Sequence, residues 1–308
     1  GKCMSRSDNG STVSGVIIVN KHSGVTSHKL VQIIRRLYNT RKVGHTGTLD
    51  PMATGVLPVL IGRAVKASDF LCAEDKEYVA EMTLGITTDT EDITGEVLTK
   101  SDNIPDEAAV MTACRGFVGE ISQIPPMYSA IKIDGRKLVD IARSGETVER
   151  KARAVTISSI DCERVSDTVY RLRVRCSKGT YIRTLCADIG ASLGCGAVMS
   201  GLCRTRSGNF TVDEAHTMEE LESMTPEQLE AIVTPVENLF SDLAAVEVND
   251  FYLKLIKGGT ELYQKKLHTD LSDGELVRIR HDSRFVALGR VTEFPDGSAV
   301  KPVKLFEL

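Results

Sequence analysis

The chain of 308 residues contains no tryptophan and no apolar run that approaches the roughly 20 residues of a membrane span. Its cysteines and histidines never occur at the C-x-x-C or H-x-x-x-H spacings of metal and redox sites. A G-x-G-x-x-G loop after the first strand and a G-K-[ST] phosphate loop are also missing. We therefore expect no membrane partner, no metal site and no cofactor.

The length exceeds that of a usual single domain, which predicts one large domain with a smaller one. Eight cysteines without paired spacing indicate reduced thiols, as in the cytoplasm. Residues 1–14 are small and polar and lack the apolar stretch of a secretory signal. Residues 1–3, ahead of Met4, are interpreted as a remnant of cloning.

Acidic residues are concentrated in one segment. Residues 207–253 hold eleven Asp and Glu and no Lys or Arg, although the whole chain has a net charge of only −4. The remaining residues are therefore net positive. Residues 132–183 hold thirteen Lys and Arg against seven Asp and Glu, so this segment can meet phosphates. Charge alone is equally compatible with a solvated basic surface.

Apolar periodicity and turn residues predict irregularly interleaved strands and helices. We expect a polar, basic excursion at 123–153 with a helical turn near 137–142, a solvated acidic loop at 87–95 and a small all-β unit after residue 242. This order favours a mixed α+β sheet over a doubly wound one. The expected strands are 15–20, 56–61, 77–84, 155–164 and 169–176, and the expected helices are 26–39, 64–73, 105–115, 180–193 and two that begin near 217 and 225.

Three arginines alternate with buried-type residues along the strand at 169–176. Arg171, Arg173 and Arg175 share one face of this strand, which lines RNA or faces water. We favour water for all three.

The loop at 41–55 carries the most information. It holds three glycines and a proline without usable periodicity, and its single acid is Asp50. Glycines permit close backbone approach and the proline fixes the next φ, so the loop can present the carboxylate as a nucleophile. Taken alone, an Asp-Pro at a turn more often hydrogen-bonds its own backbone.

The stretch G44HTGTLDPMATG55 resembles the signature of the TruB family of tRNA pseudouridine synthases at nearly every position. Three further similar stretches fall in the family's order, and Q123IPPMYSAIKIDGRKL138 resembles the thumb-like insertion that embraces RNA. The resemblance covers about residues 15–206. The three stretches are G15VIIVNK21, K76EYVAEMTLG85 and S177KGTYIRTLCADIG190.

The resemblance implies a catalytic role for three residues. Asp50 matches the catalytic aspartate, and Arg183 matches the arginine that pairs with it. Tyr78 matches the tyrosine expected to stack on the uracil and to assist removal of the C5 proton. Without the resemblance, Arg183 would be read as a helix-surface residue and Tyr78 as core.

Three more residues match substrate-binding positions. Lys21 matches a basic residue near the pocket that supports its loops or contacts RNA, and Leu202 matches an apolar residue lining the uracil pocket. His45 matches a histidine that fills the stack vacated by a flipped-out uridine. By residue type alone, Lys21 and His45 would be exposed and Leu202 would be core.

The implied fold is the pseudouridine synthase fold, an α+β architecture with a mixed, mainly antiparallel central sheet, flanking helices and a small C-terminal β domain. The expected division is a catalytic domain at 15–243, with the thumb-like insertion at about 123–153, and a PUA-like RNA-binding domain at 244–308. The latter has ten basic and ten acidic residues, hence no net attraction for RNA.

The implied function is the isomerisation of uridine to pseudouridine at position 55, in the T-loop of tRNA. The partners expected are the tRNA T-arm and, for the C-terminal domain, the acceptor stem, with no obligate protein partner and a monomeric state. The alternatives are a noncatalytic tRNA-binding or folding protein and a synthase for another uridine. A hydrolase ranks third, since no second carboxylate is identifiable as its acid. The sequence leaves open whether Asp50 attacks C6 or C1′ or stabilises a sugar intermediate.

Overall fold

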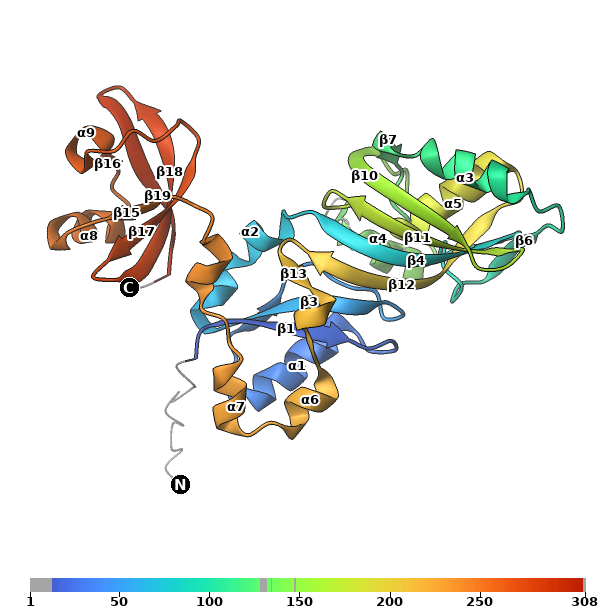
Figure 1. The fold of residues 1–308 in the computed structure, drawn as a ribbon, viewed down its shortest axis with the longest axis horizontal. Helices are drawn as coiled ribbons and strands as arrows, with labels where there is room; N and C mark the ends of the chain where they lie inside the picture. Colours follow the sequence, from blue (N-terminus) through green and yellow to red (C-terminus); the bar gives the residue numbers. More distant parts are fainter. Residues whose placement is uncertain (1–12, 128–131, 134, 147, 307–308) are drawn as a thin grey trace.

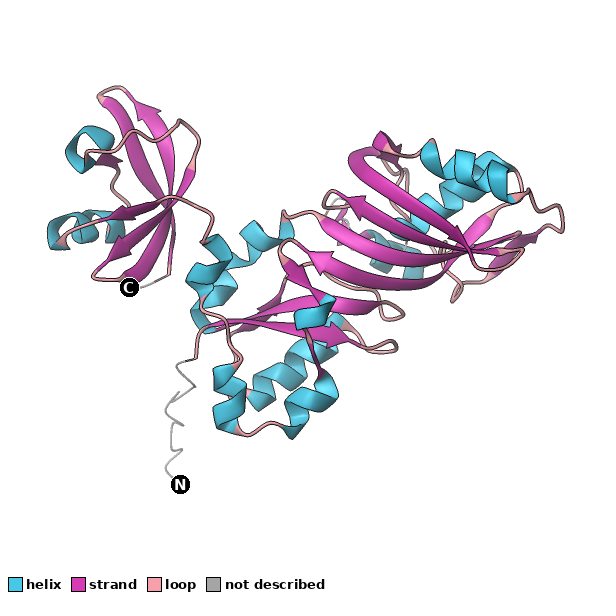
Figure 2. Ribbon diagram, viewed as in Figure 1, coloured by secondary structure: helices cyan, strands magenta, loops and turns pink. Residues whose placement is uncertain are grey.

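A computed structural model describes residues 13–306, except 128–131, 134 and 147. Its largest feature is a mixed, mainly antiparallel sheet flanked by helices (Figures 1 and 2), which confirms the predicted α+β class. The strand order is β14 (His216–Thr217), β1 (Gly15–Lys21), β3 (Thr54–Ile61), β12 (Ala197–Ser207), β4 (Lys76–Leu84), β11 (Val169–Cys176), β10 (Arg153–Arg164) and β7 (Gly119–Gln123).

One half of the sheet packs on the N-terminal helix. Strands β1 and β3 pair from Gly15↔Ile61 to Lys21↔Gly55 and bury their apolar residues against α1 (Ser27–Leu37), α6 (Met218–Ser223) and α7 (Pro226–Ala231). The helix α1 begins where predicted, because the Thr26 side chain accepts a hydrogen bond from Lys29 N at 3.0 Å. The other face of these strands packs on a 3-10 turn (Gly62–Ala67) and α2 (Ser68–Cys72).

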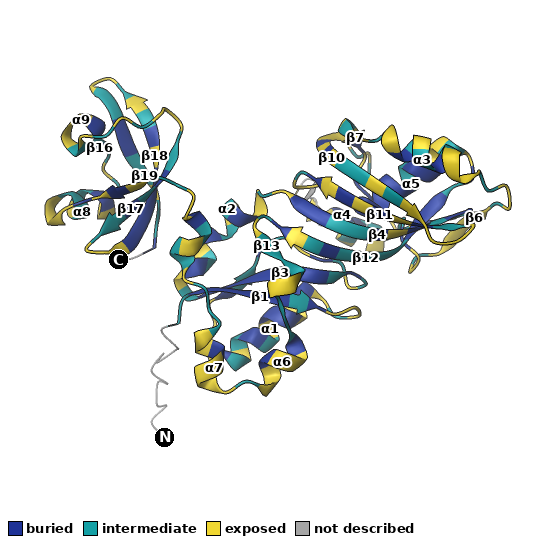
Figure 3. Cartoon of the chain, viewed as in Figure 1, coloured by how far each residue is buried: buried dark blue, intermediate teal, exposed yellow. Residues whose placement is uncertain are grey.

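The other half packs on α3 (Glu107–Arg115) and α5 (Ile182–Leu193), which cover one face of β4, β11 and β12. Alternate residues of β11 are buried under these helices, as the alternation predicted. The opposite face is open to solvent (Figure 3), and there Arg173 and Arg175 both pair with Glu77, while Arg171 lies 3.5 Å from Glu163. These arginines are therefore exposed, as favoured, yet each is engaged by a neighbouring strand.

The two halves meet at a narrow seam. Strand β12 pairs with β3 at only two positions, Cys203↔Thr54 and Arg204↔Gly55, while it pairs with β4 along most of its length. Tyr78 and Leu202 pack against the hydrophobic cores of both halves. Residues at this seam therefore depend on both halves for their placement.

Three local expectations were wrong. The loop at 41–55 contains a strand, β2 (Val43–His45), which pairs with β3 and is too short to show periodicity. Helix α5 follows Tyr181, and Thr180 bonds back to Ser177 O instead of capping it. The acidic loop at 87–95 is only partly solvated, because Thr88 and Asp92 are buried.

The insertion at 123–153 contains a short hairpin, β8 (Lys132–Ile133) with β9 (Arg136–Lys137), and the predicted helical turns, α4 (Leu138–Arg143). Part of the thumb-like motif, residues 128–131 and 134, lies outside the described residues. So do residues 1–12, which include the proposed cloning remnant. A hairpin of β5 (Ile86–Thr88) and β6 (Val97–Lys100) precedes the insertion.

The C-terminal unit is a five-stranded sheet with the order β15 (Ala245–Glu247), β17 (Leu276–His281), β18 (Arg284–Phe294), β19 (Gly297–Leu305) and β16 (Leu262–Tyr263). It also holds α8 (Asp250–Lys257) and α9 (Gln264–Leu267), so it is not all β. Phe240, Phe285 and Phe306 pack together with Ala67 and join this unit to the rest of the chain. No helix in the described part of the chain is long and apolar enough to span a membrane.

Candidate active site

A small cavity lies at the seam between the two halves of the main sheet. Its volume is about 100 Å³. Four of the six residues singled out in the sequence line it: Asp50, Tyr78, Arg183 and Leu202. These residues come from the loop before β3, from β4, from α5 and from β12, so the fold brings together Asp50 and Leu202, which are 152 positions apart in the sequence. The remaining lining residues are Thr48, Leu49, Thr180, Tyr181, Ile182 and Met199.

A buried arginine lies between two carboxylates in this cavity. Arg183 Nε is 4.0 Å from Asp50 Oδ2, and Arg183 Nη1 is 3.8 Å from Asp92 Oδ2. The side chain of Asp50 is 42% exposed, whereas those of Arg183 and Asp92 are each 7% exposed. Of the two carboxylates beside Arg183, only that of Asp50 is exposed to solvent.

Asp92 belongs to the loop that the sequence indicated to be solvated, and that interpretation was wrong for Asp92, which is buried. Its Oδ1 accepts hydrogen bonds from Thr90 Oγ1 at 3.1 Å and from Thr94 N at 2.9 Å, which close a compact turn. The turn is joined to β12, because Met199 N donates to Glu91 O and Ile93 N donates to Met199 O. A cluster of acidic and hydroxyl residues is typical of surface turns, so the sequence held no signal that this turn packs on Arg183.

The start of α5 is held from two further sides. Gln123, which is 1% exposed, accepts a hydrogen bond from Tyr181 N at 2.9 Å and donates to Tyr181 O at 3.1 Å. Thr184 Oγ1 donates to Glu91 Oε2 at 2.5 Å. Arg183 lies between these two anchors, so its backbone is fixed before any substrate binds. In the sequence, Gln123 stood out only as the first residue of the thumb-like motif, and this contact was not predicted.

Tyr78 lies on β4 and lines the cavity. Burial raises the pKa of its hydroxyl, and the charge and hydrogen bond of Arg204 oppose that rise only in part. The tyrosine is therefore a neutral phenol near neutral pH. Its ring can stack on a base, and its hydroxyl is a poor proton acceptor in this state.

Lys21 does not line the cavity and instead supports the loop that carries Asp50. It is fully buried, and its Nζ donates to His22 O at 2.9 Å, to Pro51 O at 3.0 Å and to Ala53 O at 2.6 Å. Burial lowers its pKa to about 8, and the charge of Asp50 opposes this fall. Of the two roles considered for Lys21, the contacts support the loop-supporting one.

These contacts predict a pH dependence of activity. Above a pKa of about 8, Lys21 is neutral and keeps two N–H donors for three carbonyls, so at least one contact to the loop weakens. We expect the single-turnover rate to fall about 10-fold as the pH rises from 7 to 9, the equivalent of one hydrogen bond of roughly 1.4 kcal/mol. Lys21→Arg stays charged throughout this range, so its rate should be flat from pH 7 to 9. Parallel declines in both proteins would show that Lys21 is not the titrating group.

His45 lies on β2, where it pairs with Val59 of β3, and it is half-buried outside the cavity lining. Its Nδ1 is buried without a hydrogen-bond partner in the described residues. Burial, and then the positive Arg204 and the neighbouring His28, lower its pKa, so the imidazole is neutral at pH 7. The structure thus separates His45 from the four cavity residues, and its insertion into RNA stays a prediction.

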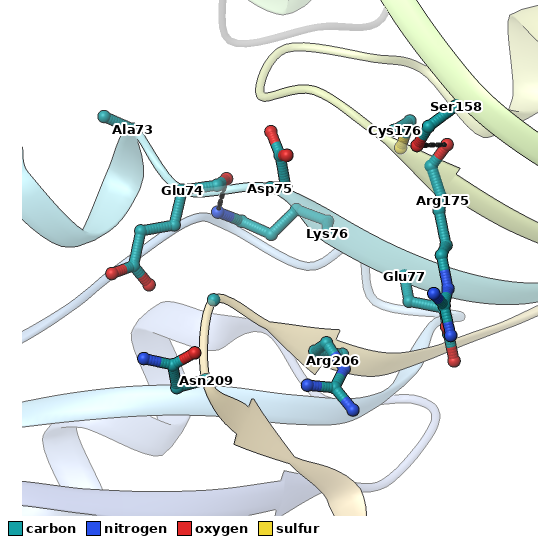
Figure 4. Close-up of a pocket in the computed structure, with 11 residues that line it drawn as sticks. Ala73, Glu74, Asp75, Lys76, Glu77, Ser158, Arg175, Cys176, Arg206 and Asn209 are labelled. Carbon is teal, nitrogen blue, oxygen red and sulfur yellow. Dashed lines mark hydrogen bonds and ion pairs between the residues drawn. The ribbon is translucent and has the colours of Figure 1, made fainter.

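A larger cavity of about 640 Å³ opens where β4 begins and where β11 and β12 end (Figure 4). Several of its charged groups already engage neighbours: Arg175 Nε lies 2.7 Å from Glu77 Oε2, and Lys76 Nζ donates to Glu74 O at 2.5 Å. None of the six predicted site residues lines it. The larger cavity also holds an exposed carboxylate, Asp75, but the smaller cavity brings four of the predicted site residues together and is the better candidate for chemistry.

One group of possible metal ligands occurs among the described residues. Atoms of Asp250, His281 and Asp282 lie within 4.8 Å of one another in the C-terminal unit. The two carboxylates are 94% and 84% exposed, and His281 Nε2 already lies 2.7 Å from Asp250 Oδ1. The group does not belong to the cavity, and we give it no part in the chemistry there.

Two protein-family models match most of the described chain. Residues 35–182 match the TruB family pseudouridylate synthase N-terminal domain, and residues 183–241 match the tRNA pseudouridylate synthase B C-terminal domain. The first match ends one residue before Arg183. The cavity is therefore assembled from both matched segments.

Curated relatives resemble nearly the whole chain. A tRNA pseudouridine synthase B of Francisella tularensis subsp. novicida is 43% identical over 94% of this chain and 93% of its own length. One from Alkaliphilus oremlandii is 45% identical over 91% of this chain and 93% of its own length.

Among solved structures, a chain from a Cbf5-Nop10-Gar1 complex is similar, with a TM-score of 0.72 and 31% identity over 95% of this chain and 84% of that chain. A chain from an H/ACA RNP bound to a substrate RNA containing 2'-deoxyuridine has a TM-score of 0.69 and 28% identity over 96% of this chain and 85% of that chain. The second of these chains comes from an assembly that holds RNA.

Proposed function

Since the chain belongs to the TruB family of pseudouridylate synthases and is a tRNA-modifying isomerase, we propose that its target is the uridine at position 55, in the T-loop. We also propose that Asp50 is its catalytic carboxylate. The observation that carries the proposal is the arrangement of Asp50 over Arg183 in a cavity also lined by Tyr78 and Leu202. This arrangement offers a half-exposed carboxylate, a buried cation and an aromatic ring to one base.

The reaction breaks the bond from N1 of uracil to C1′ of the ribose, turns the base and joins C5 to C1′. One proton leaves C5 and one reaches N1, so atoms and electrons balance without an oxidant or a hydrolytic water. Asp50 can serve by attack on C6 of the base, by attack on C1′ of the ribose, or by stabilising a sugar intermediate. Each route needs the carboxylate to face the substrate, and Asp50 is the exposed member of the charged trio.

Arg183 stabilises the charge of Asp50 and holds its position. An arginine buried between two carboxylates is placed more firmly than one that pairs with a single acid, because Asp92 neutralises it from behind. Separations of 4.0 and 3.8 Å are longer than hydrogen bonds, which leaves Asp50 room to move toward a bound ribose or base. Asp92 is accordingly a residue that orients Arg183.

Tyr78 and Leu202 hold the uracil. Both line the cavity, so an aromatic face and an aliphatic side chain are available to pack on the two sides of a flat base. A uridine in a folded T-arm must leave its stack to enter, at a cost of a few kcal/mol. We propose that the neutral imidazole of His45 fills the gap in the RNA.

The remaining parts of the chain would hold the RNA around the cavity. We propose that residues 15–243 form the catalytic domain, that residues 123–153 act as the thumb against the T-arm, and that residues 244–308 form a PUA-like unit on the acceptor stem. Support comes from the Gln123 contact to Tyr181, which ties the base of the thumb to the cavity wall. We further propose a monomer that acts in the cytoplasm. A noncatalytic RNA-folding role on the same scaffold is a second activity that would not need Asp50.

The proposal is tested by mapping pseudouridine in an unmodified tRNA transcript after incubation with the chain. We expect modification at position 55 and at no other uridine, with a T-arm fragment as an equally competent substrate. A matched transcript with cytidine at position 55 should remain unmodified. Modification at another uridine would contradict the proposed target, and tRNA binding without modification would favour the noncatalytic alternative.

A further inference from the structure

Arg204 is the largest fully buried side chain in the described part of the chain, with a relative exposure of 1%. It lies on β12, two residues beyond Leu202 of the cavity. Burying a guanidinium is costly unless its N–H groups find acceptors, so the groups that it contacts indicate what the burial achieves.

The side chain of Arg204 joins the two ends of the loop that carries Asp50. Its Nη2 donates to Gly47 O at 2.9 Å, and its Nε donates to Val56 O at 2.9 Å. Gly47 precedes Asp50 by three residues and Val56 follows it by six. One rigid fork therefore sets the distance between the points where the loop leaves and re-enters the sheet.

The backbone of Arg204 joins the same loop to Tyr78. Arg204 is the partner of Gly55 in the parallel pairing with β3 and of Tyr78 in the antiparallel pairing with β4. Gly55 has a φ of +107°, and a Cβ there would lie 2.1 Å from Arg204 O, so only glycine permits this approach. An irregularity in the pairing between Arg204 and Arg206 follows directly, and such bulges re-aim side chains.

The charges around Arg204 exclude a simple ion pair. Within the described ranges no carboxylate forms a salt bridge with it, and its ionisable neighbours include Lys76 and His45, whose pKa values its positive charge lowers. The hydroxyl of Tyr78 forms a hydrogen bond with the side chain of Arg204. The guanidinium is satisfied by main-chain carbonyls of the catalytic loop, which points to the placement of that loop as its role.

We infer that Arg204 is a positioning residue for the isomerisation, because it holds the loop of Asp50 in register with Tyr78. It acts through Asp50 and does not contact the reacting atoms. The inference rests on the proposed role of Asp50. It adds a residue on β12 to the set on which the reaction rate depends.

The test compares Arg204→Lys and Arg204→Gln with the wild-type chain. Neither substitute can span both carbonyls as the fork does, and lysine keeps the charge. At saturating tRNA we expect single-turnover rates about 10²-fold lower, the loss typical of an ångström-scale misplacement, with Kd for tRNA within about 3-fold of wild type. Arg206→Lys is the matched control, since Arg206 is exposed on the same strand and lines the larger cavity (Figure 4), and its rate should stay unchanged.

Two results would overturn the inference. Wild-type rates in both Arg204 variants would show that the loop is placed without the fork. Equal losses in rate and in tRNA affinity, or failure of both variants to fold, would assign Arg204 to the fold as a whole. Asp50→Asn measured alongside separates this inference from the proposed function, because activity in Asp50→Asn would reject the proposed function, whereas a dead Asp50→Asn with active Arg204 variants would reject only the role of Arg204.

Discussion

Asp50→Asn is expected to reduce isomerisation by at least about 10³-fold while tRNA binding changes little, because losses of this order follow removal of a catalytic nucleophile. The substitution preserves size and removes the charge of the exposed carboxylate in the cavity. Single-turnover rates should be measured with tritium release from C5-labelled uridine, and binding by filter retention. Turnover near that of wild type in a sequence-verified variant would remove Asp50 from the chemistry.

His45→Ala serves as the contrasting variant for Asp50→Asn. If the imidazole replaces a flipped base, its loss should slow the reaction on a structured T-arm and have a smaller effect on a flexible RNA in which the uridine is already unstacked. Asp50→Asn should fail on both RNAs. Equal fractional losses for His45→Ala on the two RNAs would reject the role of His45 in filling the gap and leave it a structural residue of β2.

Arg183→Met is expected to lower the single-turnover rate by about 10²–10³-fold, as for loss of one preorganised charge contact, and to destabilise the fold by about 3 kcal/mol. The stability loss follows because Asp92, whose side chain is 7% exposed, then lacks its cation. The rate loss follows because Asp50 loses the cation at 4.0 Å. Urea unfolding and single-turnover assays measure the two effects separately.

The double variant Arg183→Met with Asp92→Asn separates structure from chemistry. Removing both charges of the buried Arg183–Asp92 pair leaves neither of them buried without its partner, so much of the lost stability should return. Activity should stay as low as in Arg183→Met, because Asp50 still lacks its partner. Recovery of activity together with stability would show that Arg183 acts only through the fold.

The sequence predicted the parts of the site that local pattern can encode. The glycine-rich loop singled out Asp50 as its one acid, but only the family signature made it a site residue, together with Arg183, Tyr78 and Leu202. The cavity brings these four residues together. The class of fold followed from strands and helices in irregular order. The alternation in β11 even separated its buried residues from Arg171, Arg173 and Arg175.

Residues whose importance depends on distant partners were beyond such reasoning. Asp92 sits in a turn that any surface loop could contain, and only tertiary packing places it against Arg183. Gln123 contacts the main chain of Tyr181, 58 positions away, and Arg204 contacts the main chain of Gly47, 157 positions away. Every residue carries these main-chain groups, so the sequence does not indicate which of them accept such contacts. Strand β2 was missed for a similar reason, since its partner supplies most of the information that defines it.

The buried cations around the catalytic loop imply a trade-off between stability and activity. A chain selected only for a high melting temperature would place apolar side chains at Lys21 and Arg204, because desolvating a charge for main-chain acceptors gains less than close apolar packing. In this chain the buried charges of Lys21 and Arg204 lower the stability of the fold, and their contacts order the loop of Asp50 before tRNA binds. Engineering for heat resistance at these two positions should therefore be expected to yield sturdier but slower enzymes.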